Sequence, residues 1–242
     1  MKILIIRHGE PDYPNNTLTE KGFREARELG ERLGKVRIDN IYASPLNRAM
    51  YTAQPTADAL GKDITVLDWL KEFQGRCIST ADGTQVIPWN QPPQVWTLKD
   101  EYYDIHTWDR EEWMNSGDAV QQYEYVTSEF DKLLESHGYV RDGVIYHCKE
   151  NSDKTIAFFC HFALGMTLVS RLCGISPVLL WQTMFLPTSS VTAFVTEERK
   201  KGEVVFKCMQ LGDTSHLYAN GSEISKSGLY PEFYMGEGVR TI

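Results

Sequence analysis

Arg7 and His8 follow directly on an apolar run, Ile3 to Ile6, and precede Gly9 near the start of the 242-residue chain. A neutral imidazole can attack phosphorus as a nucleophile. An arginine guanidinium can bind phosphate oxygens through two parallel hydrogen bonds. The pair therefore has the groups needed to bind a phosphoryl group and to attack it.

Three further residues could complete this chemistry. Phosphoryl transfer needs positive charge around the phosphoryl oxygens and a proton for the leaving oxygen. Arg48 offers a second guanidinium, and His161 offers a second imidazole at the start of a predicted helix, whose free N–H groups favour an anion. When protonated, His161 would add a third cation. Glu72 is the candidate general acid, which needs a pKa raised by partial burial, and Asp68 is the alternative donor.

The elements that must position these residues alternate along the chain. Ile3 to Ile6 has the pattern of a strand buried on both faces. Thr19 is a plausible N-cap for a helix from Glu20 to about Lys35, whose buried side is predicted to hold Phe23, Ala26, Leu29 and Leu33. The next predicted elements are a strand at 38–43, a helix that starts at Ser44-Pro45, is kinked or divided by Pro55 and ends at Gly61, and a strand at 64–67.

The same alternation resumes at Lys154 to Cys160, a strand that ends at His161. Helices are predicted at 162–173 and 176–185, and strands at 191–196 and 203–211. Helices that alternate with buried strands favour an α/β fold, here a three-layer α/β/α sandwich with a mostly parallel sheet. Ligands of such sheets bind beyond the carboxyl ends of the strands, where Arg7 and His8 would lie. The tail from Gly212 to Ile242 is expected to pack on the surface.

An aromatic-rich insertion, at about 73–151, separates Glu72 from His161. No linker composition marks its edges, so we expect one domain over 1–242, with the insertion as a cover over the site. Only 120–136 has a clear helical pattern. Its aromatic side chains could contact an apolar leaving group, although packing of the insertion onto the core is the role their composition favours. Its carboxylates could repel a highly charged leaving group. The tryptophans concerned are Trp89, Trp96, Trp108 and Trp113.

Several motifs occur in a fixed order along the chain. They are Arg7-His8-Gly9, Leu18-Thr19-Glu20-Lys21-Gly22, Ser44-Pro45-Leu46-Asn47-Arg48-Ala49, Leu70-Lys71-Glu72 and Phe158-Phe159-Cys160-His161. The series resembles the histidine phosphatase superfamily, also called the phosphoglycerate mutase-like family, in its phosphatase branch. The resemblance covers residues 2 to about 75, resumes near 155 and leaves the insertion uncovered.

The resemblance implies a phosphatase that hydrolyses a phosphate monoester through a phosphohistidine on His8. It assigns Glu72 as general acid, and Arg7, Arg48 and His161 as catalytic and substrate-binding groups, with no metal and no cofactor. The family's loop asparagine is replaced here by Pro14, so Asn15 or Asn16 is expected to take its substrate-binding role. The arginine-rich clamp of the mutases is not recognisable. A phosphoglycerate mutase-type phosphotransferase and a non-catalytic module that binds a phosphorylated ligand are the alternatives.

The composition of the chain limits the classes of molecule that it is expected to bind. A net charge of −8 argues against nucleic acid and anionic membranes, which leaves a small phosphorylated substrate. Five scattered cysteines without ligand spacing, and an N-terminus without a signal-peptide pattern, predict a cytoplasmic protein. Asp213, Ser215 and His216 have the residue types of a triad, but their near-adjacent spacing favours a turn in the tail. The sequence carries no prediction of the physiological substrate or the oligomeric state.

Overall fold

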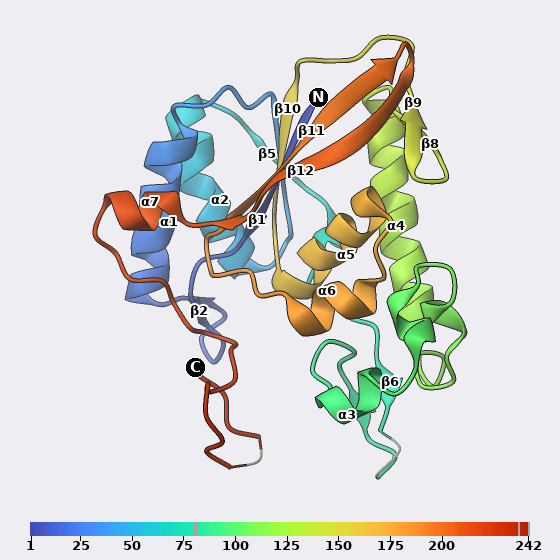
Figure 1. The fold of residues 1–242 in the computed structure, drawn as a ribbon. Helices are drawn as coiled ribbons and strands as arrows, with labels where there is room; N and C mark the ends of the chain where they lie inside the picture. The colour runs from blue at the N-terminus through green and yellow to red at the C-terminus, as the bar shows by residue number, and fades with distance from the viewer. Residues whose placement is uncertain (80–81, 237, 242) are drawn as a thin grey trace.

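The computed structural model describes residues 1–79, 82–236 and 238–241. Its main sheet has eight strands in the order β5-β4-β10-β1-β11-β12-β9-β8 and lies between two groups of helices (Figure 1). The predicted α/β/α sandwich is therefore confirmed. Among the described residues, no helix combines the length and the apolar composition that crossing a membrane requires.

The half of the sheet that carries Arg7 and leads to His8 and His161 consists of parallel strands. The strands concerned are β1 (Lys2–Arg7), β10 (Thr155–Cys160), β4 (Asn40–Ala43) and β5 (Ile64–Val66). β10 is buried along its whole length, as its uninterrupted apolar run predicts. Because β1, β10 and β4 pair in parallel, their carboxyl ends meet at one edge of the sheet.

The other half of the sheet is antiparallel, so the sheet as a whole is mixed. Its strands are β11 (Val191–Lys200), β12 (Glu203–Asp213), β9 (Ile145–His147) and β8 (Val140–Asp142). The expected mostly parallel arrangement thus holds for the four strands β5, β4, β10 and β1. The long hairpin β11–β12 pairs with β1 through β11, and the end of the insertion contributes β9 and the edge strand β8.

Helices cover both faces of the sheet (Figure 1). On one face, α1 (Glu20–Leu33) and α2 (Asn47–Leu60) pack against Leu4 and Ile6 of β1. On the other face lie α4 (Ala119–Ser136), α5 (Phe162–Cys173) and α6 (Pro177–Thr183), which pack against Ile3 and Ile5. This alternation of β1 side chains between two cores follows from the twofold period of a strand.

The first two helices differ from expectation at three points. Phe23 lies outside the core, 38% exposed, against the ring of Tyr51. α2 begins at Asn47, because the Ser44 hydroxyl accepts a hydrogen bond from the Leu46 N–H in a turn before the helix. α2 continues through Pro55 without dividing. There Pro55 packs closely on Gly30 of α1, where an added Cβ would lie 2.7 Å from the Pro55 Cβ.

The insertion is mostly irregular apart from α4. Its tryptophans Trp108 and Trp113 are buried in the same core cluster as Phe158 of β10.

The short elements of the chain are β2 (Pro11–Asp12), β3 (Thr17–Leu18), η1 (Asp68–Leu70), β6 (Cys77–Ile78), β7 (Gln85–Val86), α3 (Pro93–Trp96), η2 (Asp100–Tyr103), η3 (Trp108–Arg110) and α7 (Ser215–Ala219).

Candidate active site

Three strand ends bring polar side chains to one point. His8 follows β1, His161 follows β10, and Ser44 follows β4. The ring centres of His8 and His161 are 5.1 Å apart, and His161 Nε2 lies 2.8 Å from the Ser44 hydroxyl oxygen. The parallel register of the strands thus places together two histidines separated by 153 positions in the sequence.

His8 is held as a neutral imidazole with a defined orientation. Its Nδ1 lies 2.7 Å from the carbonyl oxygen of Gly9, which can only accept, so Nδ1 carries the proton and Nε2 keeps a free lone pair. Burial lowers the pKa of His8 well below its usual value, and the charges of Arg7 and Arg48 lower it further. A neutral imidazole with its lone pair on Nε2 is the form that can act as a nucleophile.

Gly9 permits the close approach of α1 and α2 to this turn. The Gly9 N–H donates to the Thr52 hydroxyl at 2.8 Å, and an added Cβ at Gly9 would lie 2.7 Å from the carbonyl oxygen of Gly22. Any larger residue would push the His8 backbone away from α1. The glycine after His8 is therefore explained by packing.

The two arginines approach the histidines from different sides. Arg7 is buried, donates to the carbonyl oxygens of Leu186 and Ser227, and has its guanidinium carbon 5.3 Å from the centre of the Phe185 ring. Arg48, in the first turn of α2, has its guanidinium carbon 5.5 Å from the centre of the Tyr13 ring. Within the described chain, neither forms an ion pair, and the Nε of each has no partner. Both therefore keep donors for an incoming anion.

His161 differs from expectation in its charge. Burial lowers its pKa well below the usual value, and the nearby His8, Arg48 and Arg7 lower it further. The imidazole is therefore neutral in this arrangement, and the expected third cation requires the negative charge of a bound phosphate to raise that pKa. Its Nδ1 is buried without a partner among the described residues, so a donor or acceptor remains for a ligand.

Glu72 lies at the N-terminus of α5. Its carboxylate accepts hydrogen bonds from the backbone N–H groups of Phe73 and Leu164, both at 2.9 Å, and from Ala163 at 3.4 Å. Burial raises its pKa, while these hydrogen bonds and Arg48 oppose the shift. The helix N–H groups expected to bind substrate are therefore occupied by the candidate acid. Asp68 is exposed and paired with Lys71, which leaves Glu72 as the candidate donor.

A cavity of about 540 Å³ lies next to these groups and is lined by Arg7, Arg48, Glu72, Trp89 and Trp96. Neither His8 nor His161 is among its described lining residues. Trp108 and Trp113 are buried elsewhere, so the four insertion tryptophans divide into two that reach the cavity and two that pack the core. Glu72 is the only carboxylate among the described lining residues.

Asn15 lies outside this cavity. It is exposed, and its backbone N–H and side-chain amide both bind the carboxylate of Asp12, at 3.2 and 2.8 Å. Asn16 is also exposed, in a left-handed conformation with φ of 50°. The loop residue that lines the cavity is Tyr13, which the sequence analysis did not select.

The tail also contributes residues that sequence analysis missed. Gly228, Leu229, Tyr230 and Arg240 line the cavity, whereas the sequence predicts only that the tail packs on the surface. Glycines and scattered aromatic residues gave no periodic signal there. Arg240 is an arginine in a glycine-rich tail and is in that respect a candidate ligand-binding residue. No local sequence pattern, however, predicts that the tail folds back to the cavity.

His216 supports the turn after His8 instead of forming a triad. Its Nε2 lies 2.9 Å from the Ser189 hydroxyl oxygen, whereas Asp213 binds Arg32 and the Ser215 hydroxyl. Ser189 has a φ of 57°, which is rare for a residue other than glycine, and its N–H donates to the carbonyl oxygen of His8 at 3.0 Å. The contact with His216 thus helps to hold the strained residue that fixes the His8 backbone.

We expect stability to fall in mild acid, partly because of His216. Burial lowers its pKa to about 4, whereas the unfolded imidazole titrates near 6.5. The unfolded state therefore binds the proton first, so the stability this group contributes is complete above about pH 6.5 and is lost as the pH falls toward 4. In urea unfolding at several pH values, His216→Gln should lose less stability than the wild type between pH 7 and 4.5. Equal losses in the two proteins would contradict this role.

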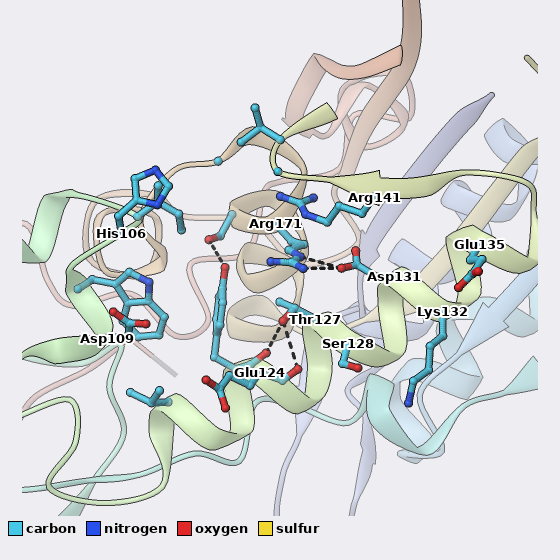
Figure 2. Close-up of a pocket in the computed structure, with 18 of the residues that line it drawn as sticks. His106, Asp109, Glu124, Thr127, Ser128, Asp131, Lys132, Glu135, Arg141 and Arg171 are labelled. Atoms are coloured by element: carbon cyan, nitrogen blue, oxygen red, sulfur yellow. Dashed lines mark hydrogen bonds and ion pairs between the residues drawn. The ribbon is translucent and has the colours of Figure 1, made fainter. Parts of the chain in front are cut away.

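A larger cavity of about 750 Å³ lies between α4, α5 and the β8–β9 hairpin (Figure 2). Figure 2 shows Arg171 directed at Asp131, and its Nη2 and Nε donate to one Asp131 oxygen at 2.5 and 3.0 Å. None of the candidate catalytic residues lines this cavity. Arg171 and Asp131 pair with each other in this lining, and size alone does not identify the site.

Among residues 1–79, 82–236 and 238–241, no group of three or more His, Cys, Asp or Glu residues is placed to hold a metal ion. The groups around His8 are instead cations and hydrogen-bond donors. They suit a tetrahedral oxyanion.

Comparison with known proteins agrees with this geometry. The sequence model of the histidine phosphatase superfamily (branch 1) matches residues 3–208. The chain belongs to the histidine phosphatase superfamily. Over part of its length the superfamily member is 44% identical to the 2,3-bisphosphoglycerate-dependent phosphoglycerate mutase of Thermoplasma acidophilum. That match covers 26% of this chain and 38% of the mutase, so the chain spans well under half of that relative.

Solved structures of other superfamily members share the fold. A phosphoserine phosphatase from Entamoeba histolytica is 23% identical, with a TM-score of 0.59 and coverage of 89% of this chain and 98% of that chain. A mycobacterial glucosyl-3-phosphoglycerate phosphatase is 17% identical, with a TM-score of 0.60 and coverage of 88% and 99%. At these identities the likeness establishes the fold alone.

Proposed function

We propose that this histidine phosphatase superfamily member hydrolyses a phosphate monoester through a phosphohistidine on His8, with Glu72 as general acid and without a metal. The observation that carries the proposal is the Nδ1–Gly9 hydrogen bond of neutral His8, which leaves Nε2 free beside Arg7 and Arg48. The tautomer of His161 is not fixed in this way, because its Nε2 partner, the Ser44 hydroxyl, can either donate or accept.

In the first step, His8 Nε2 attacks phosphorus and forms the N–P bond as the bond to the ester oxygen breaks. Protonated Glu72 gives its proton to the leaving oxygen, and the alcohol departs. In the second step, a water attacks the phosphohistidine and gives a proton to the Glu72 carboxylate. The N–P bond breaks, phosphate is released, and both side chains return to their initial forms.

Arg7, Arg48 and His161 stabilise the charge on the phosphoryl oxygens during both steps. The substrate class is a small phosphorylated molecule, in line with superfamily members that act on phosphoserine or glucosyl-3-phosphoglycerate. We place the protein in the cytoplasm, because all five cysteines are free thiols. The local match to a mutase makes phosphotransfer the alternative, which is separated by testing whether the phosphoryl group passes to a second acceptor or to water.

Truncation of Arg48 should slow the reaction strongly. Arg48→Ala is expected to lose about 2–4 kcal/mol of transition-state stabilisation, like the loss of an oxyanion-hole donor. Arg48→Lys should remain slow, because a point charge cannot reproduce two parallel hydrogen bonds. The measurement is kcat/KM on an aryl phosphate, with exposed Arg27→Lys on α1 as the control. Wild-type activity in Arg48→Lys would show that the bidentate contact is not needed.

Activity should not require a divalent metal. A panel of phosphate esters assayed with and without a chelator is expected to give rates within about twofold, since a catalytic metal would contribute several kcal/mol. The four cationic or imidazole groups around the site supply this charge stabilisation. Complete loss of activity in chelator, restored by magnesium or manganese, would refute the metal-free scheme while keeping the phosphatase assignment.

A further inference from the structure

The C-terminal segment returns to the candidate active site. The Ser225 hydroxyl donates to Glu10 at 2.5 Å, and Arg7 donates to the carbonyl oxygen of Ser227 at 3.3 Å. Gly228 has a φ of 91°, and an added Cβ there would lie 3.3 Å from Arg7 Nη2. Figure 1 shows this segment, in dark red, running past the β2 turn. The tail is therefore fitted closely to the residues around His8.

Backbone hydrogen bonds then fold the tail back on itself. The Gly228 N–H donates to the Thr241 carbonyl oxygen at 2.9 Å, and the Thr241 N–H donates to the Leu229 carbonyl oxygen at 2.7 Å. This pairing places the Arg240 guanidinium carbon 4.6 Å from the centre of the Tyr230 ring. The guanidinium also donates to the side-chain oxygen of Asn90. Arg240 thus connects the tail to the insertion loop at the wall of the cavity.

The charges of the cavity are unbalanced. Its described lining includes Arg7, Arg48 and Arg240 but only one carboxylate, Glu72. Within the described chain, Arg240 has no carboxylate within ion-pair distance, and its partner Asn90 is neutral. No carboxylate of the insertion is among the described lining residues, so the lining does not support the expected repulsion of charged leaving groups.

The transferred phosphoryl group does not account for Arg240. Arg7 and Arg48 lie beside the histidines and serve that group, whereas Arg240 is held on the insertion side by Asn90 and Tyr230. Trp89 and Trp96 line the same cavity and provide flat apolar surface. A further cation in a cavity with such apolar walls fits a leaving group that ends in an anion.

Resting on the proposed function, we propose that Arg240 is a specificity-determining residue, which selects leaving groups that carry a second anionic group beyond a flat apolar part. A guanidinium fork binds carboxylate and phosphoryl oxygens alike, so the shared chemistry is a planar or tetrahedral oxyanion. Asn90 and the Tyr230 ring hold the fork in place before the ligand arrives, which reduces the entropy lost on binding.

Binding of substrate-like phosphonates tests this without turnover. Benzylphosphonate, 4-(phosphonomethyl)benzoate and 1,4-phenylenebis(methylphosphonate) share one body and differ at the far end. By calorimetry, the wild type should bind the two doubly anionic ligands about tenfold more tightly than benzylphosphonate, the effect of one charge-assisted hydrogen-bonded contact. Whichever of the two doubly anionic ligands binds more tightly identifies the second anionic group as a carboxylate or a phosphoryl group. Equal affinity for all three ligands in the wild type would overturn the proposal.

Variants locate the selectivity. Arg240→Gln should bind all three ligands nearly equally, Arg240→Lys should keep part of the preference, and Arg110→Gln, an exposed arginine outside the cavity, should keep all of it. A preference that persists in Arg240→Gln, in a protein with the wild-type circular dichroism spectrum, would overturn the assignment. A misfolded Arg240→Gln leaves Arg240→Lys and the wild-type ligand comparison to decide.

Turnover separates this inference from the proposed function. Phenyl phosphate and 4-carboxyphenyl phosphate should both be hydrolysed, with a kcat/KM ratio that depends on Arg240. Hydrolysis of neither ester, together with Arg240-dependent binding, would refute the phosphatase and keep the second anion site. Hydrolysis of both with a ratio unchanged in Arg240→Gln would keep the phosphatase and refute the site.

Discussion

Replacement of His8 by alanine is expected to abolish hydrolysis of every phosphate ester, lowering kcat by at least about 10⁴-fold. In the proposed mechanism, His8 Nε2 forms the bond to phosphorus, and alanine has no atom that can take its place. His161 is held differently, with its Nε2 at the Ser44 hydroxyl and its buried Nδ1 without a partner among the described residues. The measurement is kcat on an aryl phosphate at neutral pH.

The control for this variant must separate chemistry from stability, because His8 is buried with 2% of its surface exposed. Circular dichroism and thermal unfolding should show that His8→Ala remains folded. His137→Ala removes another imidazole, bonded to the Tyr42 hydroxyl at 2.8 Å and outside the site, and should keep its activity. Activity of folded His8→Ala within tenfold of the wild type would contradict the assigned nucleophile.

Glu72→Gln is expected to slow hydrolysis of alkyl phosphates by about 10²–10⁴-fold, the usual contribution of a general acid. Esters of 4-nitrophenol should be affected much less, because that leaving group needs no proton. Burial raises the pKa of Glu72, so the protonated donor persists toward neutral pH and wild-type kcat/KM should fall as the pH rises through that pKa. The variant should lack this decline.

The comparison uses kcat/KM, which reports the steps up to departure of the alcohol. Asp68→Asn, at an exposed carboxylate paired with Lys71, is the matched control and should behave as the wild type. Equal losses for alkyl and nitrophenyl esters in Glu72→Gln would mean that Glu72 acts only by binding the N-terminus of α5, through Ala163 and Leu164.

Local patterns in the sequence predict the half of the molecule that carries the histidines. Apolar runs that end in polar residues identify β1 and β10, and hence the strand ends that deliver His8 and His161. The helix predicted at 162–173 agrees with α5, because Gly174 adopts the left-handed conformation that ends it. Thr19 caps α1 as predicted, with its hydroxyl accepting from the Gly22 N–H. In these elements the local sequence pattern predicts the observed secondary structure.

The rest of the site depends on contacts between distant segments, which no local pattern encodes. Arg240 reaches Asn90 across 150 positions, and the tail pairs with itself through two backbone hydrogen bonds that any residue could make. Trp89 and Trp108 are both tryptophans of the insertion, yet Trp89 lines the cavity and Trp108 is buried in the core. Asn15 was selected by analogy with a loop position, but Asp12 holds it in a turn outside the cavity.

The central claim is that the phosphoryl group passes through His8. Wild-type protein should be mixed with a ³²P-labelled phosphate ester, quenched within milliseconds in alkali, and mapped by peptide mass spectrometry. We predict a label that survives base, is released by acid and lies on the peptide that contains His8, with none on folded His8→Ala. Label on a different residue, or on His8→Ala as strongly as on the wild type, would contradict the phospho-His8 mechanism.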